Sequence, residues 1–496
     1  MSRALVGALL FSAFQSYCAV PSLDCLYPIA AQRGTTNAIS AVGKFDPWPP
    51  KMWTSVAGVS FFAETNKGKF RIAVAAESPP GPCFVRAYNE QGASEPRFLV
   101  ITDLGEIAER EPNNDFDSAQ SFEKLPAIVN GRLDKTDDVD AYRVQLNAGQ
   151  TLVASMEAYV LGSPVDGVIR LLDARGVEVA FNHDDGRTFD PQIIYTAPNA
   201  GSFLLQAFGF SYPADSAIRF VGNDKCVYRL HVSAGPCPKL DQLISASLSE
   251  SEPNNKATNA TAVDTPCAIK ACIGSPEDED AFKFMAKKGD KLVLKVESAA
   301  FGFPLDARLR IEDEKQKELA KAEDSKTADP VLDWTAPEDG AFVATVRNLL
   351  QRGGPDHLYR FSIQRPEPSL KATVSEHAFT IEPGKTNKIK ITLKRTHGFE
   401  ARISVAIEGL PKDVLCEPVE ADGKAGEATL SLSASADAQP FSGPIRILAK
   451  NLETGSTSAA LRELISAGEN NGVPNGYSQL LIDATEHLWL TVKAKP

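Results

Sequence analysis

The chain has 496 residues, which is too long for one hydrophobic core and predicts several domains. Charged residues make up 23% and hydrophobic residues 43% of the sequence, as in folded globular modules rather than disordered chains. The net charge of −12, without any clustered run of lysine and arginine, argues against nucleic acid as a partner. The same acidic balance is compatible with divalent cations.

The N-terminus has the features of an export signal. Arg3 precedes a mostly apolar run over residues 4–14, which is too short to span a bilayer. Ala19 offers a small residue for cleavage, so we expect a signal peptide over residues 1–20; a buried first strand is the alternative. No later segment reaches the roughly 18 apolar residues of a membrane helix. We therefore expect a secreted, periplasmic or cell-surface protein that is not transmembrane after signal removal.

Eight cysteines are present, and an exported location permits disulfides. No CxxC pair or Cys/His cluster has the spacing of a zinc site, so a structural role is favoured. The sequence does not determine the connectivity. Pairs that would each close within one stretch are Cys25 with Cys83, Cys226 with Cys237 and Cys267 with Cys272, leaving Cys416 alone.

Residues 21–101 show short apolar runs separated by turn residues. Residues 69–75 alternate with period two, and residues 83–88 form a second β-like run. A segment of this size and pattern predicts a small immunoglobulin-like sandwich. Stretches within residues 26–35 and 89–96 resemble the N-terminal immunoglobulin-like modules of large exported planctomycete proteins.

A short acidic string occurs twice further along the chain. It reads Glu-Arg-Glu-Pro-Asn-Asn from Glu109 and Glu-Ser-Glu-Pro-Asn-Asn from Glu250. An acidic loop follows each copy, and matching motifs along both segments keep an offset of 139 to 141 residues. Such steady spacing indicates two copies of one fold, at residues 109–234 and 250–365.

Each copy alternates short apolar runs with turns, as in residues 141–146 and 203–208 of the first. About seven or eight short strands at this spacing predict a jelly-roll-like β-sandwich. Residues 315–326 have a helical composition, but their counterpart in the first copy is strand-like. We therefore expect a strand there as well.

A Pro-Glu-Pro linker ends at Pro368, and residues 369–496 return to β-patterned runs that fit a second immunoglobulin-like sandwich. Within it, residues 468–476 are rich in Asn and Gly and are expected to form a loop. The whole sequence predicts an all-β, multi-domain string of β-sandwiches. Their order is immunoglobulin-like, two jelly-roll-like units, immunoglobulin-like.

The repeated string places several oxygen atoms on a short extended segment. Alternate side chains of an extended chain point the same way, so Glu109, Glu111 and Asn113 can converge. Asp137 and Asp140 arrive from the acidic loop. Carboxylate and amide oxygens in this number suit Ca²⁺, which takes roughly six to eight oxygen ligands. The competing interpretation is a solvated linker that its proline holds extended.

The Glu-Pro-Asn-Asn strings, the acidic loops and the later Ala-Pro-x-x-Gly-x-Phe turn resemble the bacterial pre-peptidase C-terminal (PPC) domain. That β-sandwich is appended to many secreted peptidases and is related to the collagen-binding domains of clostridial collagenases. The resemblance implies a set of structural calcium ligands in each copy. These are Glu109, Glu111, Asn113, Asn114, Asp137 and Asp140, and then Glu250, Glu252, Asn254, Asn255, Glu277 and Asp280.

Both copies depart from the calcium-binding pattern of the family. Each has Asn where that pattern has Asp after the first Asn, and Glu277 replaces an Asp in the second copy. Because one charge per site is missing, the departure predicts sites that fill at millimolar calcium.

Collagen-binding relatives use exposed aromatic residues on the strand after the Gly-x-Phe turn. The resemblance therefore implies a ligand face at Phe208, Phe210 and Tyr212 in the first copy. The second copy has Arg347 and Leu349 on that strand. Packing of the aromatic residues against a neighbouring loop or domain is the alternative, because only a contiguous exposed patch would indicate a ligand.

We find no nucleophile elbow, His-Glu-x-x-His, phosphate loop or dinucleotide fingerprint, and none of the six histidines suggests a catalytic base. The cluster that begins at His183 is best interpreted as a turn, because its counterpart lacks the histidine. We expect no enzyme, but a protein that adheres to extracellular or cell-envelope polymers or proteins. The alternatives are an accessory subunit of a secreted peptidase and, more weakly, a cryptic polysaccharide hydrolase. The oligomeric state stays open.

Overall fold

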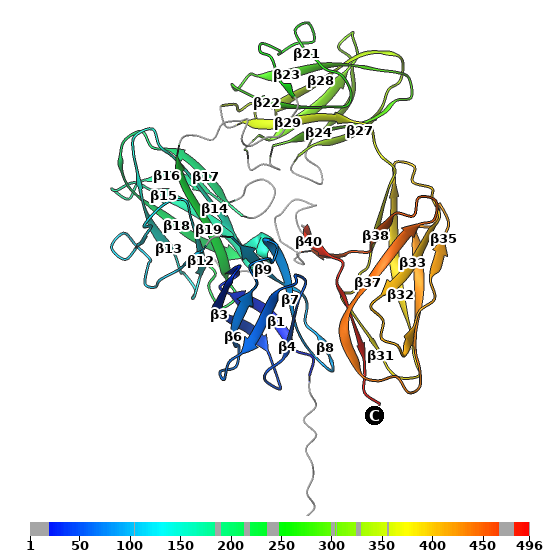
Figure 1. Cartoon of the computed structure of the whole chain (residues 1–496). Helices are drawn as coiled ribbons and strands as arrows, with labels where there is room; N and C mark the ends of the chain where they lie inside the picture. Colours follow the sequence, from blue (N-terminus) through cyan, green and yellow to red (C-terminus); the bar gives the residue numbers. More distant parts are fainter. Residues whose placement is uncertain are drawn as a thin grey trace, which may run out of the picture.

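The computed structural model describes residues 19–103, 105–183, 190–212, 219–235, 248–298, 303, 305–323, 329–354, 357–465 and 481–495. The chain is all-β, and its strands form four sandwich modules (Figure 1). In the described residues the one helical element is a short 3₁₀ turn, η1 (Tyr159–Leu161). No helix among those residues has the length and apolar character needed to cross a membrane. The expected signal peptide, Cys237 and residues 468–476 lie outside the described ranges.

The first module packs two sheets, with strand orders β1-β3-β6-β5 and β2-β9-β7-β4, and β8 pairs with β7. The short connections and mostly antiparallel pairing fit the immunoglobulin-like expectation. Its strands are β1 (Ser22–Tyr27), β2 (Ala30–Gln32), β3 (Thr35–Lys44), β4 (Lys51–Thr54), β5 (Val59–Ala63), β6 (Lys69–Val74), β7 (Gly81–Asn89), β8 (Gly92–Ala93) and β9 (Arg97–Thr102).

The second and third modules share one topology. The sheet orders are β10-β12-β19-β14-β17 and β11-β13-β18-β15-β16 in the second, and β20-β22-β29-β24-β27 and β21-β23-β28-β25-β26 in the third. The second module contains β10 (Ile107–Ala108), β11 (Gln120–Ser121), β12 (Ala127–Arg132), β13 (Asp140–Leu146), β14 (Thr151–Glu157), β15 (Val165–Leu172), β16 (Glu178–Asn182), β17 (Gln192–Thr196), β18 (Gly201–Ser211) and β19 (Val227–Gly235). The third contains β20 (Leu248–Ser249), β21 (Thr261–Ala262), β22 (Cys267–Cys272), β23 (Glu279–Ala286), β24 (Lys291–Glu297), β25 (Ala307–Glu312), β26 (Glu318–Ala322), β27 (Val331–Thr335), β28 (Gly340–Asn348) and β29 (Leu358–Gln364).

The prediction of a strand within residues 315–326 is confirmed by β26, which pairs with β25 as β16 pairs with β15. Local composition favoured a helix, yet the pairing partner decides the structure, as is common for strands. The internal repeat was therefore the better guide than the local propensity.

The fourth module has sheets ordered β30-β32-β36-β34 and β31-β41-β37-β33-β35, with β38 beside β37 and a separate β39-β40 hairpin. Its strands are β30 (Ser369–Thr373), β31 (Ala378–Ile381), β32 (Thr386–Thr396), β33 (Ile403–Glu408), β34 (Val414–Leu415), β35 (Val419–Ala421), β36 (Glu427–Ala434), β37 (Phe441–Asn451), β38 (Thr457–Ala459), β39 (Arg462–Ile465), β40 (Leu481–Thr485) and β41 (Leu488–Val492).

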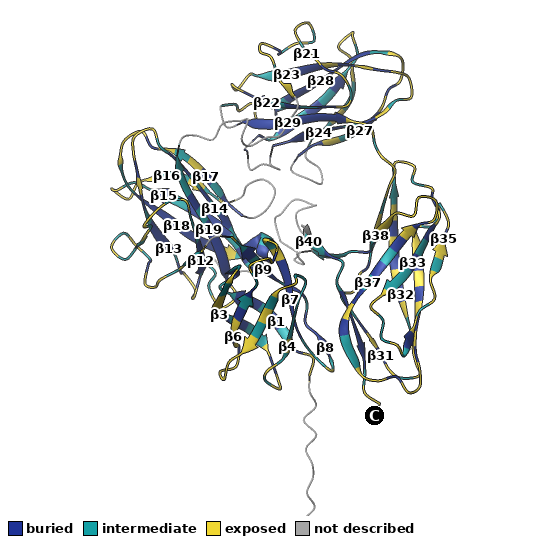
Figure 2. Cartoon of the chain, in the orientation of Figure 1, coloured by how far each residue is buried: buried dark blue, intermediate teal, exposed yellow. Residues whose placement is uncertain are grey.

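Each module has its own hydrophobic core between its two sheets. The cause is the period-two alternation of the strands, which sends every second side chain inward. In β36, for example, exposed and buried residues alternate over the whole strand. Figure 2 shows the same division in all four modules, with buried positions on the strands and exposed ones at loops and outer faces.

Two of the considered disulfides do not form. Cys25 and Cys83 are free thiols in different hydrophobic clusters. Cys267 and Cys272 stand at the two ends of β22, about 17 Å apart at the rise of a β-strand, which a disulfide cannot span. Burial raises the pKa of Cys25 to about 12, so this thiol stays protonated and unreactive.

The modules pack against one another instead of hanging on free linkers. One apolar cluster joins Phe84 and Phe98 of the first module to Leu161 and Val227 of the second, and Leu464 of the β39-β40 hairpin packs against it. Figure 1 shows β40 reaching from the fourth module toward this junction, where it contacts η1. Three modules thus meet at one apolar junction.

The first and fourth modules also meet at a buried arginine. Arg86 is 0% exposed and donates to Ser94 O at 2.8 Å, to His377 Nδ1 at 2.8 Å and to His487 O at 3.0 Å. Burial lowers the pKa of His377 to about 4, so its ring is neutral and its Nδ1 can accept. Beside it Trp489 packs against Trp53, with ring centroids 5.9 Å apart. These contacts therefore hold the first module against the fourth.

We predict that Arg86→Met destabilises this junction. The substitution keeps the length of the side chain but leaves buried acceptors in both modules without a donor, which costs about 1–3 kcal/mol. Chemical denaturation should show the loss, and hydrogen exchange should increase in β41. Arg71→Met, at an exposed position of β6, is the matched control. Equal unfolding midpoints for the two variants would contradict the prediction.

Candidate metal centre

Two equivalent acidic sites are placed by equivalent strands. The short β10 and β20 pair in parallel with β12 and β22, so the next residue of each, Glu109 or Glu250, lies at the end of the neighbouring strand. Arg132 N–H donates to Glu109 Oε2 at 2.5 Å, and Cys272 N–H donates to Glu250 Oε1 at 2.7 Å. These backbone bonds fix the first carboxylate of each string.

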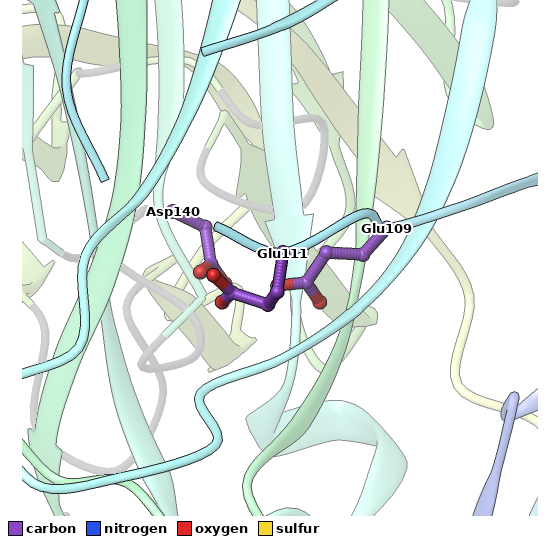
Figure 3. A group of neighbouring side chains, drawn as sticks. All are labelled: Glu109, Glu111 and Asp140. Carbon is purple, nitrogen blue, oxygen red and sulfur yellow. The ribbon is translucent and has the colours of Figure 1, made fainter. Parts of the chain in front are cut away.

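The repeated glutamates converge with an aspartate of the next long strand. Glu109, Glu111 and Asp140 each offer a carboxylate oxygen within 4.8 Å of the others, and Glu250, Glu252 and Asp280 do the same. Figure 3 shows the three carboxylates of the first site turned toward one another. Asp140 and Asp280 lie near the starts of β13 and β23, whose edges the acidic strings cross.

The aspartate of each site is completely buried. Asp140 and Asp280 are 0% exposed, and each accepts a hydrogen bond at 2.6 Å through Oδ2, from Tyr228 OH or Tyr359 OH. The other oxygen, Oδ1, receives no N–H or hydroxyl donor in either residue, and the carboxyl group of each aspartate hydrogen-bonds to Glu109 or Glu250 when one of the pair is protonated. A shared proton or an ion is needed to compensate such a buried oxygen.

The first asparagine of each string is also buried at the site. Asn113 is 0% exposed, and its backbone carbonyl accepts from Ala141 N at 2.7 Å, which ties it to β13. Its side-chain Oδ1 and Nδ2 have no partners. In the second site Asn254 Nδ2 lies 3.5 Å from Glu250 Oε2, and its Oδ1 is unpartnered. A rotation of this amide would present Oδ1 to a cation at the carboxylates.

The second asparagine is held by a residue that the sequence analysis missed. Asn114 Nδ2 donates to Asp138 Oδ1 at 3.1 Å, and Asn255 Nδ2 donates to Asp278 Oδ1 at 2.6 Å. The other oxygen of Asp138 accepts from Asp134 N at 2.7 Å, so this buried aspartate joins the acidic string to the acidic loop. An aspartate at this position in both copies was the available signal.

Asp137 and Glu277, which the PPC resemblance implied as ligands, do not join the clusters. Asp137 is exposed on a turn with φ +64°, and its Oδ1 accepts from Phe220 N at 3.3 Å. Glu277 is exposed at the equivalent turn. The turn directs these side chains outward and the following aspartates inward. Tyr228 and Tyr359 were not identified from the sequence, although each is the second residue of its strand and an arginine follows it in both copies.

Crowding and burial raise the pKa values of the carboxylates in the absence of a cation. Burial is the largest cause, and the neighbouring carboxylates add to it. The pKa of Glu109 and that of Glu250 rise to about 7, and the pKa of Asp280 rises to about 10. The pKa of Asp140 is also raised. Without a cation the groups of each site therefore hold protons that a metal ion would displace.

The donors present fit a hard divalent cation. Each cluster offers carboxylate oxygens and a neighbouring amide, with no histidine or cysteine in the group. This oxygen-only set suits Ca²⁺ better than Zn²⁺, which prefers nitrogen and sulfur ligands. The Oδ1 atoms of Asp140 and Asp280, which receive no N–H or hydroxyl donor, can act as ligands once a cation displaces the proton held between the carboxyl groups.

The aromatic residues of the expected ligand face are mostly covered. Phe208 is 5% and Tyr212 is 6% exposed, whereas Phe210 is 42% exposed. The Phe220 ring covers the strand, with its centroid 4.6 Å from that of Phe208 and 5.5 Å from that of Phe210. The three residues therefore do not form a contiguous exposed patch, and only Phe210 is accessible to a ligand.

Comparisons with known proteins give no family assignment. No family model and no curated protein matches the chain. The pre-peptidase C-terminal domain of a collagenase from Bacillus anthracis aligns over its full length with 23% of this chain, at 14% identity and a TM-score of 0.19. Fibronectin(III)-like modules of Clostridium thermocellum CbhA align over 87% of their length with 42% of the chain, at 13% identity and a TM-score of 0.15.

A larger neighbour is the Escherichia coli alpha-2-macroglobulin activated by porcine elastase. At 12% identity and a TM-score of 0.15, it covers 96% of this chain, which spans 44% of that protein. Scores this low do not establish a common family for any of the three. The sandwich fold of the present chain therefore rests on its own strand order.

We predict that the metal-free protein loses stability as the pH rises. The pKa of Glu109 and that of Glu250 are near 7 in the folded state, above the ordinary value of 4.5. Their stabilising protonation is complete below pH 4.5 and is lost as the pH passes through about 7. In EDTA, Glu109→Gln/Glu250→Gln should therefore raise the melting temperature relative to wild type at pH 8 but not at pH 4.5.

Glu123→Gln, at an exposed position of the second module, is the control for this experiment. It should follow the wild-type curve at every pH. A double variant whose difference from wild type is independent of pH would show that these carboxylates do not set the pH dependence.

Proposed function

We propose that this chain is an exported, non-catalytic binding protein whose two central sandwiches each hold a structural Ca²⁺. The observation that supports it best is the carboxylate cluster that occurs in both modules, each built on a buried aspartate, Asp140 or Asp280, whose Oδ1 receives no N–H or hydroxyl donor. Export is supported by the apolar N-terminal run. The binding role is supported by the multi-module all-β architecture and by the absence of catalytic motifs in the sequence.

Calcium would occupy the two sites with modest affinity. Two glutamates, one aspartate and one asparagine provide both charge and neutral oxygen in each site, and bidentate carboxylates raise the number of ligands. The buried position of Asp140 favours occupancy, because an uncompensated buried charge is costly. Competition with bound protons near neutral pH reduces the apparent affinity, consistent with a millimolar range.

The first site would stabilise a junction between modules. Arg132, whose backbone holds Glu109, places its guanidinium 4.6 Å from the ring centre of Tyr27 in the first module. An ion that fixes Glu109 would thus also fix the strand end that carries this cation–π contact. In the second site Cys272 occupies the position of Arg132 and has no guanidinium for a cation–π contact of this kind.

The arrangement of the carboxylates favours structure over catalysis. The backbone N–H of Arg132 holds Glu109, and Tyr228 covers Asp140, whereas a catalytic acid must reach a substrate. An accessory subunit of a secreted peptidase remains the second candidate, on the resemblance to PPC domains. A cryptic polysaccharide hydrolase is the weaker one.

We predict that Ca²⁺ raises the melting temperature and that Asp140→Asn and Asp280→Asn each weaken binding at one site. At a free calcium concentration ten times Kd, each bound ion should add about 1.4 kcal/mol to the free energy of unfolding of its module. Calorimetry and thermal unfolding in EDTA and in about 10 mM calcium test this, since extracellular modules bind in the millimolar range.

Glu123→Gln controls for a general effect of removing an exposed charge and should bind like wild type. If calcium produces neither heat nor a shift in melting temperature, the metal assignment is wrong. If both single variants bind as wild type does, the ion sits elsewhere.

Binding to polymers is tested with Phe210. We expect retention of the mature protein on insoluble matrix polymers, and a several-fold loss for Phe210→Ser would assign the contact to the one accessible aromatic residue of the expected ligand face. Phe62→Ser, which removes a 51% exposed phenylalanine of the first module, is the matched control. Co-purification of peptidase activity without polymer retention would instead support the accessory role.

A further inference from the structure

A cavity of about 560 Å³ lies between the first and the fourth module. The first module lines it with residues 53–59, which join the end of β4 to the start of β5. The fourth module lines it with residues 408–409, residues 444–446 and His487. Ligand sites commonly have this volume and commonly lie between domains. The hydrogen bonds of Arg86 hold the two modules that form the cavity against each other.

The walls of the cavity are preorganised. Gly58 has φ +83°, and a Cβ there would meet Ser78 Oγ at 2.5 Å, so the turn tolerates only glycine without a shift. Ser78 Oγ also donates to Ala57 O at 3.0 Å. On the opposite wall Gly409 has φ +85°. A site whose loops are fixed before binding loses little conformational entropy when a ligand enters.

The charges at the cavity are largely paired with one another. Arg446 Nη2 lies 3.0 Å from Glu486 Oε2, and its Nη1 lies 3.9 Å from Glu408 Oε2. Burial lowers the pKa of His487, which keeps its ring neutral. No excess of positive charge remains to attract a phosphate or another anion. This balance favours an uncharged ligand.

Hydrogen-bonding groups stand beside apolar surface in the same cavity. Within the described residues neither the indole N–H of Trp53 nor the ring of His487 has a hydrogen-bond partner, and the two rings pack with their centroids 5.2 Å apart. The Glu408 side chain is 57% exposed and offers acceptors. Trp53, Pro444 and Ile445 supply apolar surface between these polar groups.

We propose that this cavity binds a neutral oligosaccharide. A sugar ring presents apolar C–H faces and a rim of hydroxyl groups that both donate and accept, which matches the ring and indole N–H of Trp53 and the carboxylate acceptors of Glu408. A peptide added to the edge strand β4 is less suited, because only Trp53 and Thr54 of that strand line the cavity. The inference adds a ligand class to the proposed binding role and is independent of the metal centres.

The test is isothermal titration of the mature full-length protein with cellopentaose, xylopentaose, mannopentaose and chitopentaose. We expect at least one of these neutral probes to bind, with affinity reduced about thirtyfold by Trp53→Ala and about tenfold by Glu408→Gln. Glu420→Gln, at a 63% exposed glutamate of the same module that lies outside the cavity, should bind like wild type.

Trp53 also packs against Trp489, so its variant is interpreted only if its unfolding midpoint matches that of wild type. If the unfolding midpoint of Trp53→Ala differs from that of wild type, Glu408→Gln alone tests the proposal. The inference is overturned if none of the four probes binds, if binding is unchanged in Glu408→Gln, or if only peptides bind at the cavity. Calcium-dependent stabilisation that persists in that case would leave the proposed function standing.

Discussion

A buried aspartate crowded by two glutamates is the constraint on which both central modules depend. Asp140 and Asp280 lie at the starts of long strands, beneath a tyrosine of the last strand of the module. Their burial next to two glutamates is unfavourable unless protons or a cation compensate the charge. Backbone N–H groups and tyrosine hydroxyls satisfy only some of the oxygens. The acidic loop and the parallel pairing of the short strand hold the carboxylates in position. Both modules have these two elements, so the two sites have the same geometry.

The sequence predicted the duplicated part of the fold because repetition removes ambiguity. Residues 315–326 favoured a helix on composition, yet the register of the repeat identified the strand β26. Likewise the alternation of Glu109 and Glu111 predicted their convergence. Pairing over long distances was not predictable: Tyr228 reaches Asp140 only because β19 returns beside β12, and no local pattern shows that return. The choice between Asp137 and Asp138 depended on one turn with positive φ, which two adjacent acidic residues do not reveal.

The contacts between modules could not be predicted from the sequence for a related reason. Period-two alternation shows that a side chain faces one side of a strand, but not whether that side meets its own core or another module. In the sequence Arg86 and Trp489 are therefore indistinguishable from other strand residues, although they join the first module to the fourth. The same interface creates the cavity beside Trp53. A chain expected to behave as a string of independent sandwiches instead brings its two ends together.

Duplication gave the two sites equal chemistry but unequal surroundings. The acidic strings, buried aspartates and covering tyrosines correspond residue by residue, so any ion that fits one site fits the other. One neighbouring position separates them: Arg132 beside Glu109 extends to Tyr27 of the preceding module, whereas Cys272 beside Glu250 has no guanidinium to make such a cation–π contact. A change of charge at the first site therefore acts next to a contact between modules. The two copies thus have the same oxygen ligands and differ in the residues that surround them.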